Sequence, residues 1–81
     1  MTESLRELVE YIAKALVDHP EQVEVLEVKG EHVSILELKV AKEDIGKVIG
    51  KKGRNVQAMR TILSNVSGKE KKRVTLEIIE K

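Results

Sequence analysis

The first pattern along the chain is a stretch of apolar residues that recur every three or four positions, the spacing of one face of an amphipathic helix. Its members are Leu5, Leu8, Val9, Ile12, Ala13, Leu16 and Val17. Ser4 followed by Glu7 predicts a capping box at the start of this helix, with Thr2 as the alternative cap. Pro20 predicts its end, because proline has no N–H group for the helical hydrogen bond. We expect the helix to cover one face of a sheet, with Tyr11 packed at its rim.

Two stretches rich in valine, isoleucine and leucine follow at residues 22–29 and 32–40, and Gly30 separates them. This pattern predicts a β-hairpin. A two-residue turn at Gly30 and Glu31 would set a single register for both strands. The pairs that it predicts are Val25 with Leu36 and Val23 with Leu38 on one face, and Leu26 with Ile35 and Val28 with Val33 on the other.

Near the predicted turn, the apolar residues of both strands change from one face of the sheet to the other, and they do so at paired positions. An apolar patch would then lie on the face of the sheet away from the helices, formed by Leu26, Val28, Val33 and Ile35. One interpretation is a β-bulge that returns these residues to the core. The other is an exposed surface for a second copy or another protein. The pattern favours neither.

The second half of the chain predicts two helices and a strand. Residues 41–49 form a short helix with Ile45, Val48 and Ile49 on its apolar side. A longer helix is expected from about Arg54 to Ser67, with Gly68 as its C-terminal cap. Its apolar positions are Val56, Met59, Ile62, Leu63 and Val66, and a charged loop of residues 69–72 follows. The alternation of Val74, Leu76 and Ile78 with polar residues predicts the last strand.

The predicted element order is helix, strand, strand, helix, helix, strand, in one domain of residues 1–81. A helical crossover joins the second strand to the third, which predicts parallel pairing of these two. We therefore expect an α+β fold with a three-stranded mixed sheet. The strand that begins near His32 would be central, and all three helices would pack on one face.

A glycine loop, Gly50-Lys51-Lys52-Gly53, connects the two helices of the second half. Glycine lacks a Cβ atom, so the backbone there can adopt conformations closed to other residues and can approach a ligand closely. The loop leads into a helix at Arg54, and the unpaired N–H groups and partial positive charge of a helix start favour an anion. Together with the cationic side chains of Lys51, Lys52 and Arg54, this predicts a site for a phosphate backbone.

The basic residues are concentrated in the segment that contains this loop. Residues 46–73 carry nine Lys and Arg against one Glu, whereas residues 1–45 carry five Lys and Arg against eleven acidic residues. One interpretation is that these basic residues form a solvated surface whose charge is balanced by the acidic first half of the chain. We favour a polyanionic ligand, because the excess coincides with the loop. Tyr11 is the only aromatic residue, which argues against stacking of bases on aromatic rings.

The segment Val48-Ile49-Gly50-Lys51-Lys52-Gly53-Arg54-Asn55-Val56 resembles the V-I-G-x-x-G-x-x-I signature of KH domains, with Val56 in place of the usual isoleucine. In length and element order, the whole chain resembles the small bacterial single-KH proteins of the KhpA (YlqC) family. This resemblance implies a type II KH fold and binding of single-stranded RNA, as by a post-transcriptional regulator or RNA chaperone. KH modules clamp about four nucleotides against the GXXG loop.

The RNA-binding residues predicted on this basis form two groups. They are Gly50, Lys51, Lys52, Gly53 and Arg54 at the loop, and Ile45, Val48, Ile49 and Val56 as the apolar lining of a groove beside it, with Leu38 or Val40 from the central strand. Val48 and Ile49 cannot both face the bases, so at least one belongs to the core. Arg60 and Lys47 are secondary candidates for phosphate contacts at longer range.

The alternative function is a protein interaction module for which RNA binding is secondary. The KhpA resemblance implies self-association as a homodimer and pairing with a larger KH protein of the KhpB (Jag) family. Either the apolar patch of the hairpin or the helices around the glycine loop could form such an interface. Doubling a weak RNA-binding module would also raise the effective concentration at its second site.

An enzyme is not expected, and neither a cofactor nor a small-molecule substrate is predicted. The sequence has no cysteine, so it offers no disulfide, thiol nucleophile or cysteine-based metal site. His19 and His32 lie far apart in the chain, the serines lack a nucleophile signature, and the glycine loop lacks the pattern of nucleotide hydrolases. No signal peptide or membrane-spanning run is evident, so we expect a cytoplasmic protein that does not enter a membrane.

Overall fold

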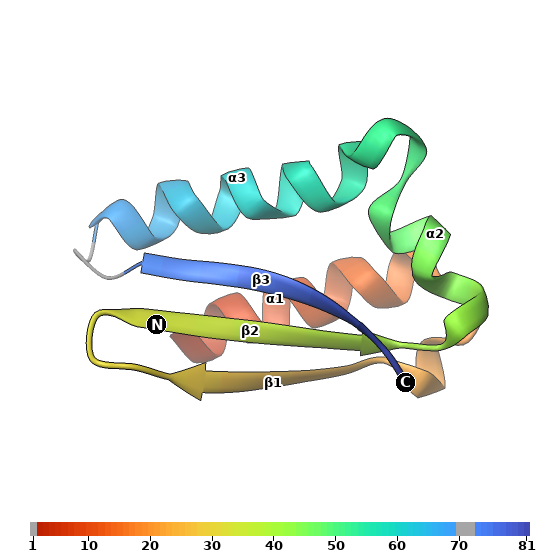
Figure 1. Ribbon diagram of the computed structural model, residues 1–81, viewed down its shortest axis with the longest axis horizontal. Helices are drawn as coiled ribbons and strands as arrows, with labels where there is room; N and C mark the ends of the chain where they lie inside the picture. Colours follow the sequence, from red (N-terminus) through yellow and green to blue (C-terminus); the bar gives the residue numbers. More distant parts are fainter. Residues whose placement is uncertain (1, 70–72) are drawn as a thin grey trace.

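The computed structural model describes residues 2–69 and 73–81 and has the element order that the sequence predicts (Figure 1). The helices and strands are α1 (Thr2–Leu16), β1 (Glu24–Lys29), β2 (Val33–Val40), α2 (Ile45–Ile49), α3 (Arg54–Lys69) and β3 (Arg73–Glu80). Single 3₁₀ turns at Pro20–Gln22, Lys42–Asp44 and Lys51–Gly53 lie between them.

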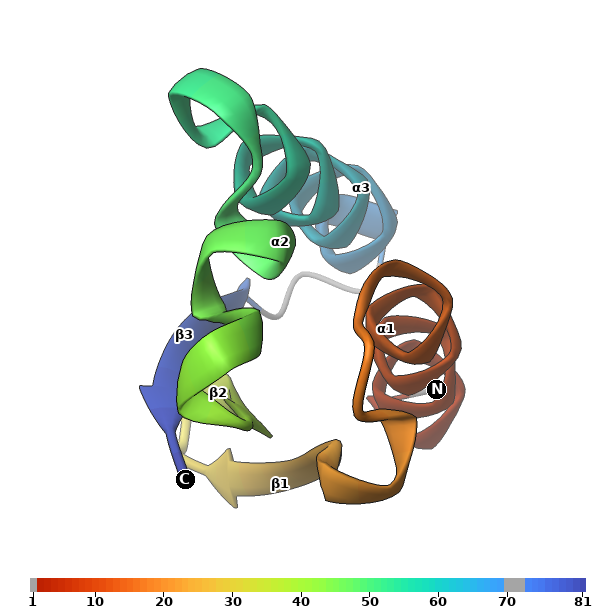
Figure 2. The ribbon, with the colours of Figure 1, turned by 90° about the vertical axis from the view of Figure 1, so that its right-hand side faces the viewer.

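The strands form one mixed sheet in the order β1-β2-β3, so β2 is central. The β1–β2 pair is antiparallel and the β2–β3 pair is parallel. α1 packs on β1 and β2, whereas α2 and α3 pack against β3, and Figure 2 shows the helices together on one side of the sheet. The predicted α+β fold, its central strand and its parallel pair are confirmed.

The core lies between the helices and the inner face of the sheet. Because side chains alternate along a strand, every second residue of β2 points into the core. These four residues, Ser34, Leu36, Leu38 and Val40, are fully buried. The helices cover them with Leu5, Val9 and Ala13 of α1, Val48 of α2, and Val56, Met59 and Leu63 of α3.

The hairpin register differs from the prediction by two residues. Val25 pairs with Leu38 instead of Leu36, and the N–H of Gly30 donates to the carbonyl of Val33 at 2.8 Å, which makes residues 31 and 32 the turn. A shift of two residues keeps every side chain on its predicted face, so the apolar pattern alone does not exclude either register. Gly30 is required for another reason: a Cβ atom there would lie 2.6 Å from the carbonyl oxygen of Val33.

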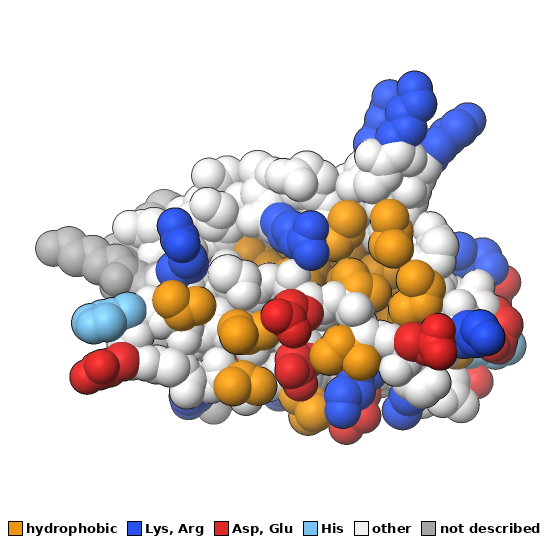
Figure 3. Space-filling model, in the orientation of Figure 1, with side chains coloured by type: hydrophobic (Ala, Val, Ile, Leu, Met, Phe, Trp, Pro, Cys, Tyr) orange, Lys and Arg blue, Asp and Glu red, His pale blue; other side chains and the backbone are white. Residues whose placement is uncertain are grey.

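Of the four residues of the apolar patch predicted near the hairpin turn, three are exposed and Ile35 is half-buried. The β1–β2 ladder pairs without interruption from Glu24 to Lys29, so the β-bulge interpretation is wrong. Leu26, Val28 and Val33 lie on the face away from the helices, and 48% of Val28 is accessible to solvent. Figure 3 views this outer face and shows hydrophobic side chains with acidic ones between them.

Two predictions at the helix ends and one within a helix are wrong. The capping box of Ser4 and Glu7 does not form at a helix start, because α1 already begins at Thr2. Gly68 does not cap α3, because the helix continues through it to Lys69. Tyr11 is 75% exposed and therefore does not pack at the rim of the core. The charged loop predicted for residues 69–72 lies largely outside the described residues.

Asp44 ties the end of α1 to the start of α2. Its carboxylate is fully buried and accepts hydrogen bonds from the backbone N–H groups of Asp18 at 3.2 Å and His19 at 3.0 Å. These two residues follow the last turn of α1, whereas Asp44 immediately precedes α2. Hydrogen bonds to a charged acceptor are among the stronger ones in proteins. This contact therefore fixes the helix that leads into the glycine loop.

We predict that Asp44→Ala lowers the free energy of unfolding by about 2–3 kcal/mol, because two backbone donors lose their charged acceptor. Urea denaturation measures this change. The matched control is Glu43→Ala, which removes a neighbouring carboxylate whose only polar side-chain partner among the described residues is the exposed ring of His19, at 3.8 Å. Equal stability of the Asp44 and Glu43 variants would contradict the anchoring role of Asp44.

Candidate nucleic-acid interface

The glycine loop forms a tight bend at a corner of the molecule, between α2 and α3 (Figure 1). Gly50 has φ +79° and ψ 170°, a conformation that essentially only glycine adopts. Gly53 also has a positive φ, of +73°, and its N–H donates to the carbonyl of Gly50 at 3.0 Å. Both glycines are thus required by the backbone, as the sequence predicted.

The two lysines inside the loop are exposed. Lys52 has φ 58° and ψ 26°, the left-handed conformation, which carries a strain of the order of 1 kcal/mol in a residue with a Cβ atom. Figure 3 shows basic side chains that project from this corner into solvent. Among the described residues, Lys51, Lys52 and the exposed Arg54 have no salt-bridge partner within 4.0 Å.

Helix α3 begins at Arg54, directly after Gly53. The N–H of Arg54 donates to the carbonyl of Lys51, and the helix dipole leaves a partial positive charge at this end of α3, which attracts an anion. The loop therefore combines this partial positive charge with three full charges within five consecutive residues. This arrangement can bind the phosphates of a polyanion.

Asn55 holds the loop against α2, a role that the sequence analysis did not assign. Its Nδ2 donates to the carbonyl of Lys47 at 2.9 Å, near the C-terminal end of α2. The same side chain fills the space beside Gly50, because a Cβ atom at Gly50 would lie 2.6 Å from Cγ of Asn55. A single asparagine in the first turn of a helix has many ordinary partners, so no sequence signal pointed to this contact.

Two secondary candidates already have partners within the protein. Nζ of Lys47 donates to Asp18 at 2.6 Å and lies 3.7 Å from Asp44. The hydrogen bond between Lys47 and Asp18 raises the pKa of the lysine and lowers that of the carboxylate, so both stay charged at neutral pH. The guanidinium of Arg60 donates to the backbone carbonyl of Leu76. Neither side chain points freely toward the glycine loop.

The predicted apolar lining divides into core and surface residues. Val48 is fully buried and Val56 is 8% exposed, so both side chains belong to the core beneath the loop and are not available to bases. Leu38 and Val40 are also fully buried, because β3 and the helices cover this part of the central strand. Ile49, which is 37% exposed, and the half-buried Ile45 remain as accessible residues of α2.

One isoleucine of β3, Ile78, was missed by the sequence analysis as part of this surface. It is half-buried on the face of the sheet that carries Val74 and Leu76, near the end of the strand that α2 contacts, whereas Ile79 points to the opposite face. Ile78 was missed because the prediction placed the central strand, not the edge strand, beside the loop. Figure 3 shows hydrophobic side chains gathered below the projecting basic residues. An apolar surface therefore adjoins the cationic loop.

Other kinds of site find no support in the described parts of the chain. Residues 2–69 and 73–81 contain no cluster of three or more acidic or histidine side chains that could hold a metal ion. None of the helices described combines the length and the apolar character that crossing a membrane requires.

We predict that Gly50→Ala lowers the free energy of unfolding by about 2–3 kcal/mol, because the new Cβ atom adds a collision with Asn55 to the backbone strain. The matched control is Gly53→Ala, with an expected cost of about 1–2 kcal/mol from strain alone, since no atom lies within 4 Å of a Cβ there. Denaturant titration measures both variants. Combining Gly50→Ala with Asn55→Ala should cost less than the sum of the single changes, and strict additivity would contradict the contact.

A comparison with protein-family models matches residues 6–78 to the model described as "KhpA/KhpB, KH domain". Three relatives, each named RNA-binding protein KhpA, align over most of the chain. The protein from Caldanaerobacter subterraneus subsp. tengcongensis is 62% identical over 73 residues, which cover 90% of this chain and 97% of the relative. The protein from Clostridium acetobutylicum is 57% identical over 75 residues, which cover 93% of this chain and all of the relative.

The third relative, from Chlamydia pneumoniae, is 53% identical over 76 residues, with 94% of this chain and 97% of the relative covered. All three names describe a binding protein and not an enzyme, in agreement with the sequence analysis. The family match and the observed element order confirm the type II KH fold. The chain therefore belongs to the KhpA/KhpB family of KH-domain proteins.

Proposed function

We propose that this protein binds single-stranded RNA, with the sugar-phosphate backbone held at Gly50-Lys51-Lys52-Gly53 and at the start of α3. The observation that carries this proposal is the bend itself, where three exposed cations and the partial positive charge at the start of α3 meet at two glycines. The relatives named RNA-binding protein KhpA support it. KH modules use such a loop to clamp about four nucleotides.

Each group at the loop has a distinct task in this proposal. The glycines let the RNA backbone approach closely, Lys51 and Lys52 contribute charge, and Arg54 contacts a phosphate from the first turn of α3. The bases lie over the apolar surface of Ile45 and Ile49. Because this surface is aliphatic, van der Waals contacts replace aromatic stacking, and we expect weak affinity with loose sequence preference.

We further propose that the protein acts in the cytoplasm as a post-transcriptional regulator or RNA chaperone, as a homodimer or with a KH protein of the KhpB (Jag) type. A single weak module gains effective concentration when it is doubled. The family model that covers both KhpA and KhpB domains supports a relation between the two.

A second candidate function is assembly with another protein, with RNA binding secondary. The exposed apolar residues Leu26, Val28 and Val33 on the outer face of the sheet favour it. Sedimentation velocity of the purified protein, with and without RNA, separates the two candidates. Stable assembly without detectable RNA binding would favour the second.

We predict that log K for binding of single-stranded RNA falls against log salt concentration with a slope of about −2 to −3, as expected for about three or four phosphate contacts. Fluorescence anisotropy of a labelled oligonucleotide at several salt concentrations measures this slope. A slope near zero would exclude an electrostatic grip on the backbone.

We predict that Lys51→Asp combined with Lys52→Asp weakens RNA binding by more than about tenfold and leaves the thermal unfolding temperature nearly unchanged, because both side chains are exposed. The control is Lys29→Asp with Lys42→Asp, which makes the same change in charge at exposed positions outside the loop. If the loop variant bound RNA as tightly as the parent, the proposed binding site would be wrong.

A further inference from the structure

The outer face of the sheet, on the side away from the helices, carries its apolar and charged residues in rows. Side chains alternate along a strand, so the strand pairing shows which outward residues of β1, β2 and β3 lie side by side. The row beside the hairpin turn has Val33 and Arg73, the next has Val28, Ile35 and Thr75, and the third has Leu26, Glu37 and Glu77. A largely apolar row therefore lies between a row with an arginine and a row with two glutamates.

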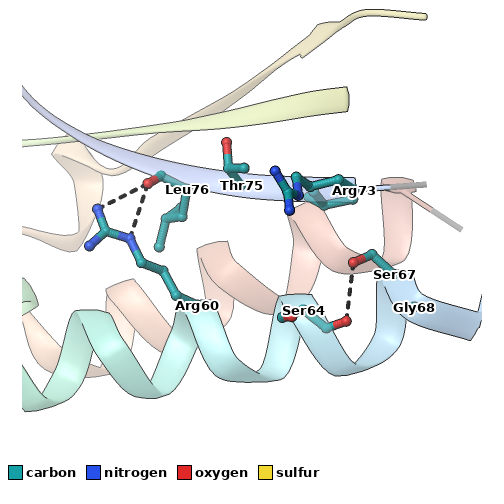
Figure 4. Close-up of a pocket in the computed structure, with 8 residues that line it drawn as sticks. Arg60, Ser64, Ser67, Gly68, Arg73, Thr75 and Leu76 are labelled. Carbon is teal, nitrogen blue, oxygen red and sulfur yellow. Dashed lines mark hydrogen bonds between the residues drawn. The ribbon is translucent and has the colours of Figure 1, made fainter. Parts of the chain in front are cut away.

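Figure 4 shows the two sides of β3. The side chain of Leu76 points toward α3, whereas that of Thr75 points away from it. Arg73 and Glu77 lie two residues before and after Thr75, so their side chains leave the strand on its side. Arg73 is exposed at the edge of the sheet, where it also lines a cavity of about 440 Å³ that Arg60 borders on the helix side. Arg73 and Glu77 thus flank the apolar row.

The charges of this face lack partners among the described residues. Glu37 and Glu77 are directly opposite each other in the β2–β3 pair, and like charges at such positions destabilise a sheet. In residues 2–69 and 73–81, neither glutamate has a salt-bridge partner within 4.0 Å, and Arg73 has none either. A molecule that covers this face must therefore offer a cation to the glutamates, a carboxylate to the arginine and apolar surface between them.

A second copy of the chain meets all three requirements. A two-fold axis that runs across the strands at the middle row would place Val28, Ile35 and Thr75 against the same residues of the second copy. The same axis would place Arg73 opposite Glu77 of the second copy, and the reverse. An axis along β2 would instead place Glu37 against Glu37 of the second copy, which is repulsive. Only the first arrangement matches apolar with apolar residues and opposite charges.

We propose that the outer face of the sheet binds a second copy of this chain, back to back, around a two-fold axis through the row of Val28, Ile35 and Thr75. This inference names the surface of the homodimer proposed above and rests on that proposal. The helices lie on the other side of the sheet (Figure 2), so the glycine loops of both copies stay uncovered. Such a dimer presents two RNA-binding loops at once, which raises the effective concentration at the second loop.

The size of the face predicts a dimer that forms reversibly. Three strands about 4.8 Å apart and the eight residues of β2, at about 3.3 Å each, give a footprint of about 370 Å². Stable protein interfaces bury about 800 Å² on each partner. The dimer is therefore weak, and its test has to cover concentrations from micromolar to millimolar.

Sedimentation equilibrium of the full chain over this range measures the dissociation constant of the dimer. Val28→Glu places two carboxylates against each other at the axis and should raise this constant at least about tenfold. The matched control is Leu8→Glu, which changes an exposed apolar residue of α1 and should leave the constant within about twofold of the parent. If Val28→Glu dimerised like the parent, the surface would be wrong and the homodimer would stand. A parent that stays monomeric throughout would overturn both.

An exchange of charges tests the arrangement of the two copies. Arg73→Glu alone should weaken the dimer at least about tenfold, because it places like charges opposite each other. Combining it with Glu77→Arg restores opposite charges and should return the dissociation constant to within about threefold of the parent. A double variant as weak as Arg73→Glu alone would exclude the proposed axis. Thermal unfolding of each variant shows that the fold is kept.

Chemical crosslinking locates the axis directly. The chain has no cysteine, so a single introduced thiol is unique. Thr75→Cys should be joined to a second copy by a short bismaleimide, because this position faces itself across the axis. Tyr11→Cys, at a position of α1 that is 75% exposed, should not. Crosslinking through position 11 and not through position 75 would place the interface on the helices and overturn the proposal.

RNA binding separates this interface from the loop. Val28→Glu should bind a tetranucleotide within about twofold of the parent, since a single loop accommodates that length. It should lose the tighter binding of an RNA long enough to reach both loops. Loss of tetranucleotide binding by Val28→Glu would contradict an interface that is independent of the loop. If Lys51→Asp with Lys52→Asp kept RNA binding while the parent dimerised through this face, the RNA-binding proposal would fail and the dimer would stand.

Discussion

The structure depends on a bend of four residues between two helices, which requires backbone conformations that only glycine adopts without a large cost. Gly50 lies in a region of φ and ψ that is closed to other residues, and the space its missing Cβ atom would occupy is filled by Asn55. The amide of Asn55 in turn holds the carbonyl of Lys47 at the end of α2. The bend is therefore fixed by backbone and side chain together, and the exposed lysines at its tip are held on a rigid support.

A second contact connects this bend to the rest of the fold. α2 has only five residues and cannot bury enough apolar surface to hold its own position. Asp44 at its start accepts two N–H groups from the segment after α1, and Val48 fills the core beneath it. The short helix is thus held at one end by a buried carboxylate and along its inner side by apolar packing. Both contacts fix the position of the loop, and neither involves the exposed cationic side chains of the loop.

The charges of the chain are arranged so that the loop cations stay available. The acidic first half pairs with its own basic residues, as Glu10 does with Arg6 and Lys14, and Asp18 pairs with Lys47 at the base of α2. In the described residues, no carboxylate comes within salt-bridge distance of the loop lysines. A polyanion that approaches this corner therefore meets cations that have no competing partner.

The sequence alone determined the element order, the faces of the sheet and the chemistry of the loop, because these follow from periodicity, from glycine and from the order of charges along the chain. Local pattern also showed that the hairpin carries apolar residues on both faces. The local pattern did not determine the register of that hairpin, since a shift of two residues leaves every side chain on the same face of the sheet. The close approach of Gly30 to Val33 determines the register. The local pattern also did not predict the ends of α1 and α3, because a capping signal inside a helix has the same sequence as one at its end.

Only the tertiary structure decided which of the predicted site residues are accessible. The spacing of Val48 and Val56 along their helices fits a core position as well as a surface position. Packing of the helices against the sheet buries both side chains. The contact between Asn55 and Gly50, the anchoring by Asp44 and the cavity that joins Arg60 to Arg73 each bring together residues from different elements. Sequence order carries no signal for such contacts, because they form only when the helices are packed on the sheet and the distances between their side chains are fixed.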